Sequence, residues 1–152
     1  MLKKILIACG VFFIALLVIY AGLFIWAFRQ SYVVAEDVTP YVEGVLPELT
    51  TWQYASFEQE LTPTLREQLE TTNGEKVLRQ FATLGALESH EPLQVIRAER
   101  GFNLSAGRYN RAIVLIPAHF EAGDAQIQLT LDKVTNGYVI NGIHISSVVF
   151  LE

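Results

Sequence analysis

The 152-residue sequence has little of the chemistry that makes active sites conspicuous. It contains one cysteine, Cys9, so a disulfide within the chain and a thiolate metal site are excluded. Its three histidines form no His-x-His or His-x-x-x-His pair, and there is no Asp-rich loop, phosphate-binding glycine loop or Gly-x-Ser-x-Gly motif. The sequence therefore predicts no cofactor and no metal site, and it indicates no particular reaction.

Charge is absent from residues 5–28, a run of 24 residues in which fifteen are Ile, Leu, Val or Phe. As a helix rising 1.5 Å per residue, this run is about 36 Å long, which exceeds the roughly 30 Å hydrocarbon core of a bilayer. Tyr20 and Trp26 lie toward its far end, where aromatic rings favour the membrane interface. The sequence therefore predicts a transmembrane helix over residues 5–28.

Residues 6–9 (Leu-Ile-Ala-Cys) match the letters of the box at which bacterial lipoprotein precursors are cut and lipidated. A cleaved signal needs roughly 7–15 apolar residues before the cut, whereas only four lie between Lys4 and Cys9. We therefore expect an uncleaved anchor. By the positive-inside rule, Lys3 and Lys4 place the amino terminus in the cytoplasm and residues 29–152 outside it, which in a Gram-negative cell is the periplasm.

These features predict four regions: a cytoplasmic tail (1–4), a transmembrane helix (5–28), a linker or helix extension (29–39) and an extracytoplasmic domain (40–152). Within the span, small residues recur every seven positions on one stripe of the helix, at Ala8, Ala15 and Gly22. Small residues let a second helix approach closely, so these three form a candidate helix-packing face.

Charge is distributed unevenly in the predicted domain. Residues 36–91 carry eleven acidic and three basic side chains, so we expect no binding to nucleic acid. Four arginines follow close together in the sequence: Arg97, Arg100, Arg108 and Arg111. They form a candidate patch for an anionic partner. Alternatively, they neutralise the acidic helices in surface pairs with residues such as Glu67 or Glu70, each worth roughly 0–1 kcal/mol.

Helix signals dominate the first half of the domain. Thr39 and Pro40 are a cap residue and a proline at the first helical position, which predicts a helix start. Pro47 predicts the end of that helix or a bend in it. A second short helical piece is expected over residues 51–60.

Two further helix starts follow. Thr62 and Pro63 repeat the pattern of cap residue and proline. Thr72 and Glu75 form a capping box, which opens the best-defined helix of the sequence. Its apolar stripe runs at helical spacing through Val77, Leu78, Phe81, Leu84 and Leu87.

After Pro92 the apolar period changes from 3.6 to 2, which indicates strands. Strands are expected over residues 93–102, 108–121, 125–133 and 138–151. Asn136-Gly137 is the strongest short hairpin signal, and Asn141-Gly142 indicates a bulge that would curve the sheet. The order predicts an α+β fold, in which helices pack on one face of a curved four-stranded antiparallel sheet.

Three stretches carry a resemblance to a known family: residues 52–65, the helix ending LRQFATLGAL, and the terminal LTLDKVTNGYVINGIHISS. In them the chain resembles the nuclear transport factor 2-like family, also called cystatin-like or SnoaL-like, in its small bacterial membrane-anchored form. Tyr138 stands where the family often has tryptophan. The resemblance covers most of residues 33–152, and many members of the family pair through the open sheet face, which makes a homodimer one expected partner arrangement. The family includes isomerases, hydratases, ligand carriers and non-catalytic assembly domains, so this fold does not fix a function.

Three functions follow as hypotheses. The first is a non-enzymatic interaction or assembly module, an accessory subunit of an inner-membrane complex. The second is binding of a small apolar ligand in the cone between helices and sheet, with a lining of Trp52, Phe81, Tyr109 and His144. The third is an isomerase or hydratase that uses His144 and Tyr109. We expect the first, because no polar constellation converges in the sequence.

The polar residues of the expected strands have simpler interpretations. Asp132 lies on the polar face of its strand and is expected to be solvated, and His119, after Pro117, is expected to have a structural role. Alternation sends His144 to the face opposite Ile143 and Ile145, unless the bulge changes its direction.

Overall fold

The structure is a computed structural model that describes residues 2–104 and 107–151, without the side chains of residues 2–10, 27–33 and 103. The chain forms two compact units, one up to Val33 and one from Val34 onwards. Residues 34–39, expected as a linker or helix extension, therefore belong to the second unit. Helix α1 (Leu2–Leu49) contributes to both.

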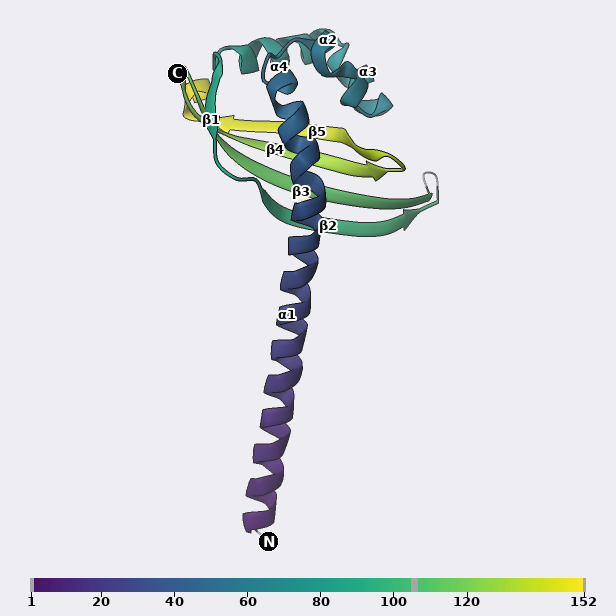
Figure 1. Ribbon diagram of the computed structural model, residues 1–152, viewed down its shortest axis with the longest axis vertical. Coiled ribbons are helices and arrows are strands. Elements are labelled where there is room, and N and C mark those ends of the chain that lie inside the picture. Colours follow the sequence, from purple (N-terminus) through teal and green to yellow (C-terminus); the bar gives the residue numbers. More distant parts are fainter. Residues whose placement is uncertain (1, 105–106, 152) are drawn as a thin grey trace. The chain divides into compact units, whose positions relative to one another are not determined.

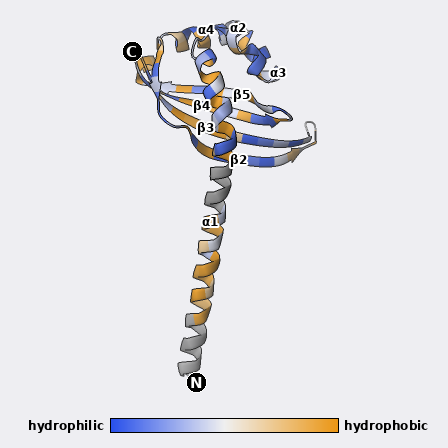
Figure 2. Cartoon of the chain, viewed as in Figure 1, coloured by the Kyte–Doolittle hydropathy of each residue, from blue (hydrophilic) through white to orange (hydrophobic). Residues whose placement is uncertain are grey.

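In the first unit, every side chain of residues 11–26 is exposed, and Figure 2 shows this part of α1 mainly in orange. Ala15 and Gly22 of the predicted helix-packing face belong to this exposed surface, whereas the side chain of Ala8 lies outside the description. Among the residues that the structure describes, no helix is both long enough and apolar enough to cross a membrane.

In the second unit, the last turns of α1 form one side of the core. The predicted helix start at Thr39 and Pro40 is wrong, because α1 continues through Pro40 and Pro47 to Leu49. A proline inside a helix costs about 3 kcal/mol. Burial offsets that cost, since each fully buried Val or Leu contributes roughly 1.5–3 kcal/mol. Five such side chains of this segment are buried: Val38, Val42, Val45, Leu46 and Leu49.

Short helices follow: α2 (Tyr54–Phe57), the 3-10 turn η1 (Glu58–Glu60), α3 (Pro63–Leu69) and α4 (Thr72–Ala82). The predicted start of α3 is confirmed, since the Thr62 hydroxyl accepts a hydrogen bond from Leu65 N. The predicted cap of α4, Thr72, is wrong by one residue, because the hydroxyl of Thr71 caps the helix by accepting a hydrogen bond from Gly74 N. Helix α4 ends at Ala82, so Leu84 and Leu87 of the predicted stripe lie beyond it. Gly85, which follows the helix, adopts the left-handed conformation (φ 79°).

Five strands form the sheet of the described chain: β1 (Leu87–His90), β2 (Gln94–Asn103), β3 (Gly107–Phe120), β4 (Gly123–Val134) and β5 (Gly137–Ser147). The order is β1-β3-β4-β5, and β2 also pairs with β3, so both β1 and β2 lie along the same edge of β3. All pairs are antiparallel. The α+β fold and the four-strand meander are confirmed. Strand β1 was missed because Leu87 fitted the helical stripe, and β5 ends before the 3-10 turn η2 (Val148–Leu151).

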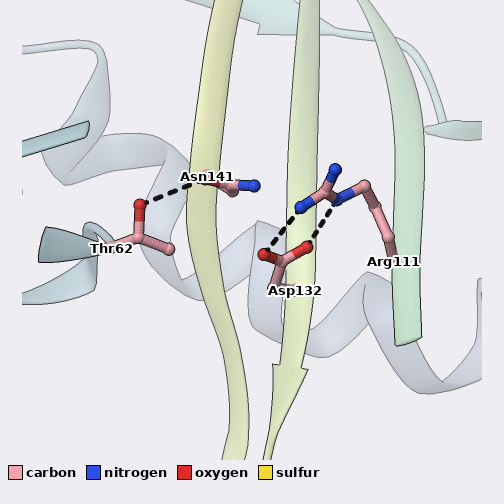
Figure 3. Close-up of polar contacts among 4 residues, drawn as sticks. All are labelled: Thr62, Arg111, Asp132 and Asn141. Carbon is pink, nitrogen blue, oxygen red and sulfur yellow. Dashed lines mark hydrogen bonds and ion pairs between the residues drawn. The ribbon is translucent and has the colours of Figure 1, made fainter. Parts of the chain in front are cut away.

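The predicted bulge in β5 is confirmed. Thr130 pairs with Gly142 and Leu131 pairs with Ile140, so Asn141 is the extra residue. Its side-chain oxygen accepts a hydrogen bond from the Thr62 hydroxyl, which ties the bulge to the start of α3 (Figure 3).

Alternation along the strands separates two faces of the sheet. In β3, the even-numbered residues from Ala112 to Phe120 are buried, while the odd-numbered residues remain partly exposed. The buried face shares one core with α1, α3 and α4 (Figure 1). The helices therefore pack on one face of the sheet, as predicted.

Candidate functional site

A pocket of about 640 Å³ opens beside the carboxyl end of α1. Its lining comes from α1, the connection after it, the end of α4 and β1: Glu43, Leu46, Pro47, Thr50, Thr51, Trp52, Ala82, Gly85, Ala86, Leu87 and His90. This volume falls within the roughly 300–1,000 Å³ of small-molecule sites.

Helical spacing brings the α1 part of the lining together. Counted from Glu43, the lining residues Leu46, Pro47 and Thr50 follow at three, four and seven positions, so all four share one stripe of the helix. The Thr50 hydroxyl donates to the carbonyl oxygen of Leu46 at 2.9 Å, so it is engaged with the backbone. The Glu43 carboxylate, which has no hydrogen-bond partner among the residues that the structure describes, is the polar group that this stripe offers to the pocket.

The opposite wall is the connection between α4 and β1. The Glu121 carboxylate accepts a hydrogen bond of 3.1 Å from Ala86 N, and it lies directly against Gly85. On β1, the Nδ1 atom of His90 lies 3.1 Å from the carbonyl oxygen of Glu91. A neutral His90 that donates from Nδ1 keeps Nε2 as an acceptor.

Trp52 is the most unusual residue of the pocket. It has φ 57°, and a bulky side chain rarely adopts this left-handed conformation. Its ring centroid lies 5.5 Å from that of Phe81 and 6.0 Å from that of Phe120, and the residue is 7% exposed. Its buried Nε1 has no hydrogen-bond partner in the described part of the chain. An unpaired buried donor costs roughly 1–3 kcal/mol. Residues in rare backbone conformations, such as that of Trp52, cluster at ligand sites.

The structure brings together only two of the four predicted lining residues. Trp52 lines the pocket, and the Phe81 ring packs against the Trp52 ring. Tyr109 and His144 occupy alternate positions on the opposite face of the sheet, so their predicted place beside Trp52 is wrong. Tyr109 packs across Gly101 instead, and its ring centroid lies 5.5 Å from the Arg111 guanidinium.

The pocket also differs in location from the cone expected between helices and sheet, because none of its lining comes from β2–β5. The inner sheet positions are filled by packed side chains, with Val114, Leu129 and Ile140 fully buried. The sequence missed Glu43, Leu87 and His90, since each looked like an ordinary helix or loop residue.

The strand register splits the predicted arginine patch between two faces. Arg97 and Arg111 lie on the face opposite the core, since they pair with Ile113 and Glu99. Arg100 and Arg108 occupy the alternate positions, toward the β2–β3 hairpin. The four arginines therefore do not form one patch.

The arginines on the outer face are paired within the sheet. Arg111 binds the Asp132 carboxylate through Nε at 2.7 Å and Nη2 at 3.1 Å (Figure 3), and this hydrogen bonding raises the pKa of Arg111. Arg97 Nε lies 3.1 Å from Glu99 Oε1. Asp132 is thus ion-paired rather than merely solvated. Glu70, an expected arginine partner, accepts from the Tyr54 hydroxyl instead.

His119 makes a hydrogen bond at the surface, which agrees with the structural role expected for it. Its Nδ1 lies 2.6 Å from Asp124 Oδ1, and this hydrogen bond raises the pKa of His119. Both residues flank the β3–β4 turn, and His119 pairs with Ser89 of β1, next to the lining residue His90. Among the described residues, no group of three or more His, Cys, Asp or Glu side chains is placed to hold a metal ion.

No known protein family, curated protein or solved structure matches this chain. A functional interpretation therefore depends on the residues and geometry described above.

Proposed function

We propose that this chain is a single-pass membrane-anchored domain that acts without catalysis, as an accessory subunit that binds a partner in an inner-membrane complex. The observation that supports the anchor is the surface of α1. From residue 11 to residue 26 it is uncharged, and its side chains are exposed on all sides. A helix that is apolar all round needs an apolar surrounding, and in the sequence the uncharged run extends over residues 5–28.

The proposal includes an orientation. Lys3 and Lys4 precede the uncharged run, whereas Arg29 is soon followed by Glu36 and Asp37. This bias favours a cytoplasmic amino terminus, which leaves the domain in the periplasm of a bacterial cell. We include distant membership of the nuclear transport factor 2-like family in the proposal, supported by helices that pack on one face of a curved antiparallel sheet.

Small residues in the span support a partner within the bilayer. Ala15 and Gly22 are exposed, and in the described part of the chain nothing beyond the adjoining helix backbone lies within 4 Å of where a Gly22 Cβ would be. A second helix could therefore approach α1 closely along this stripe.

Co-purification after mild detergent extraction tests the proposal. The full chain is expected to retain an integral membrane protein at a fixed ratio, and Gly22→Leu is expected to release it. Ala21→Leu is the matched control, since it adds similar bulk about 100° away around the helix. A reproducibly lone monomer would overturn the proposal, and equal loss with both variants would remove the role of the stripe.

The Trp52 pocket favours a second function, the binding of a small molecule. Its volume suits such a ligand, and its unpartnered Trp52 N–H and left-handed backbone are features that functional sites often contain. Native mass spectrometry of the chain purified under mild conditions is expected to reveal a bound molecule of constant mass. Trp52→Ala should abolish that mass while the far-ultraviolet circular dichroism remains. A chain that is always free of ligand would contradict this function.

A further inference from the structure

We propose that the Trp52 pocket selects a small organic cation, an amine carried on an apolar body. This inference rests on the second function above, that the pocket binds a small molecule, and adds the sign of the ligand's charge. Three features of the lining lead to it: its acidic side chains, the helix ends that converge on it and its apolar wall.

The charged side chains around the pocket are acidic. Glu43 is part of the lining, whereas neither lysine nor arginine is. Glu121 adds a second carboxylate, held against Gly85 and hydrogen-bonded to Ala86 N, both of which are lining residues. His90 is the one titratable base of the lining. A cation would therefore meet favourable charge, and an anion would meet repulsion.

Two helices end at the pocket, and the carboxyl end of a helix favours a nearby cation. Helix α1 ends at Leu49 and places Leu46, Pro47 and Thr50 in the lining, and α4 ends at Ala82, itself a lining residue. The carboxyl end of a helix carries the equivalent of about −0.5 charge, which stabilises a nearby cation. Both ends thus act in the same direction as Glu43.

Besides the polar groups of Thr50, Thr51 and Trp52, much of the remaining lining is apolar. Leu46, Pro47 and Leu87 contribute aliphatic surface, and Ala82 and Ala86 add their methyl groups. A bare metal ion would gain nothing from this surface, whereas an alkyl or aryl amine would bury its carbon atoms there, worth roughly 25 cal/mol per Å². The lining therefore fits a cation with an apolar body.

Three probes of similar size and different charge test the proposal: phenethylamine, phenethyl alcohol and 3-phenylpropionate. The full chain is used in zwitterionic lipid nanodiscs, with Trp26→Phe so that Trp52 is the remaining tryptophan. Tryptophan fluorescence then reports binding next to the pocket. The amine is expected to bind up to about fivefold more tightly than the alcohol, the range that an exposed ion pair of up to about 1 kcal/mol allows. The carboxylate is expected to bind more weakly than either.

Glu43→Gln is expected to weaken the binding of phenethylamine more than that of phenethyl alcohol, so that most of the preference for the amine is lost. Glu48→Gln is the matched control, because Glu48 is exposed on the same helix but is not part of the lining, and it should change neither affinity. If the alcohol or the carboxylate binds as tightly as the amine, charge selection is wrong and the pocket still binds small molecules. If none of the three probes binds, both the selection of a cation and the small-molecule function of the pocket are overturned.

Discussion

The Tyr138 hydroxyl donates a hydrogen bond of 2.7 Å to Asp37 Oδ2, across 101 positions of sequence. The Lys133 ammonium donates to the same oxygen. The Tyr41 ring, one turn along α1, lies 5.8 Å from the Tyr138 ring. Burial and the hydrogen bond to Asp37 raise the pKa of Tyr138, so its hydroxyl stays protonated as a donor. These contacts connect the start of the buried part of α1 to the β4–β5 hairpin.

Replacing Asp37 tests how much these contacts between α1 and the hairpin stabilise the fold. Asp37→Asn is expected to lower the free energy of unfolding at pH 7 by about 1 kcal/mol, the typical worth of a partly exposed charged hydrogen bond. Urea unfolding of the full chain in detergent, followed by circular dichroism, measures the change. Glu36→Gln, an exposed neighbour, should change stability by less than about 0.5 kcal/mol.

The same variant has a pH dependence of known sign. Hydrogen bonds from Lys133, then from Tyr138, lower the pKa of Asp37 below its usual value of 3.8. A depressed carboxyl pKa stabilises the fold above the pKa of the unfolded chain, and this contribution disappears as the pH falls through the folded value. The difference between the wild-type chain and Asp37→Asn should therefore shrink below pH 4. A constant difference down to pH 2 would contradict the role of the carboxylate.

The Arg111–Asp132 pair is expected to contribute more than the Arg97–Glu99 pair. The first is bidentate, with side chains 32% and 23% exposed, whereas the second makes one contact at 68% and 36% exposure. Double-mutant cycles with Arg→Met and carboxylate→amide changes should give a coupling energy of about 1–2 kcal/mol for the first and under about 0.5 kcal/mol for the second. Equal couplings would show that the geometry has no energetic consequence.

Two glycines should respond in opposite directions to alanine. At Gly74 an added Cβ would lie 2.4 Å from Leu69 Cα and O, so Gly74→Ala should destabilise the fold by about 1–3 kcal/mol through overcrowding. At Gly44, inside α1, a Cβ would meet nothing within 4 Å in the described part of the chain beyond the adjoining helix backbone. Gly44→Ala should therefore stabilise the helix by about 0.5–1 kcal/mol. Thermal unfolding of both variants measures the difference, and the same sign for both would contradict the packing described.

The second half of the domain was predictable because its signals are local. Alternation marked the strands, Asn136-Gly137 marked the hairpin, and Asn141-Gly142 marked the bulge. Pro40 misled the prediction because tertiary burial of α1 outweighs a local helix-start signal. Leu87 misled it because a short apolar run fits both periods until Gly85 breaks the helix.

The candidate site was less predictable than the fold. Trp52 and Phe81 were recognised as neighbours, but their partners come from α1 and β1, which meet only in the folded chain. Which face a strand residue occupies depends on register. Tyr109 was placed on the wrong face because the register was not known. The four arginines were expected in one patch for the same reason, although the register puts them on two faces.

Cys9 provides a test of how the chain is attached. If residues 5–28 form a peptide anchor, as proposed, Cys9→Ser should remain in the membrane fraction after alkaline carbonate extraction, with unchanged electrophoretic mobility. A chain lipidated at Cys9 would instead accumulate as a longer precursor when the thiol is lost. Accumulation of such a precursor would contradict the uncleaved anchor.

Protease accessibility tests the central claim most directly, because the proposed partner binding requires an anchored domain outside the cytoplasm. The full chain is expressed with a carboxyl-terminal epitope, and spheroplasts are compared with inside-out membrane vesicles. The account predicts that protease removes the epitope from intact spheroplasts, that the epitope is protected in the vesicles, and that carbonate does not extract the chain. Release of the full chain by carbonate, or protection of the epitope in intact spheroplasts with digestion in the vesicles, would contradict the account.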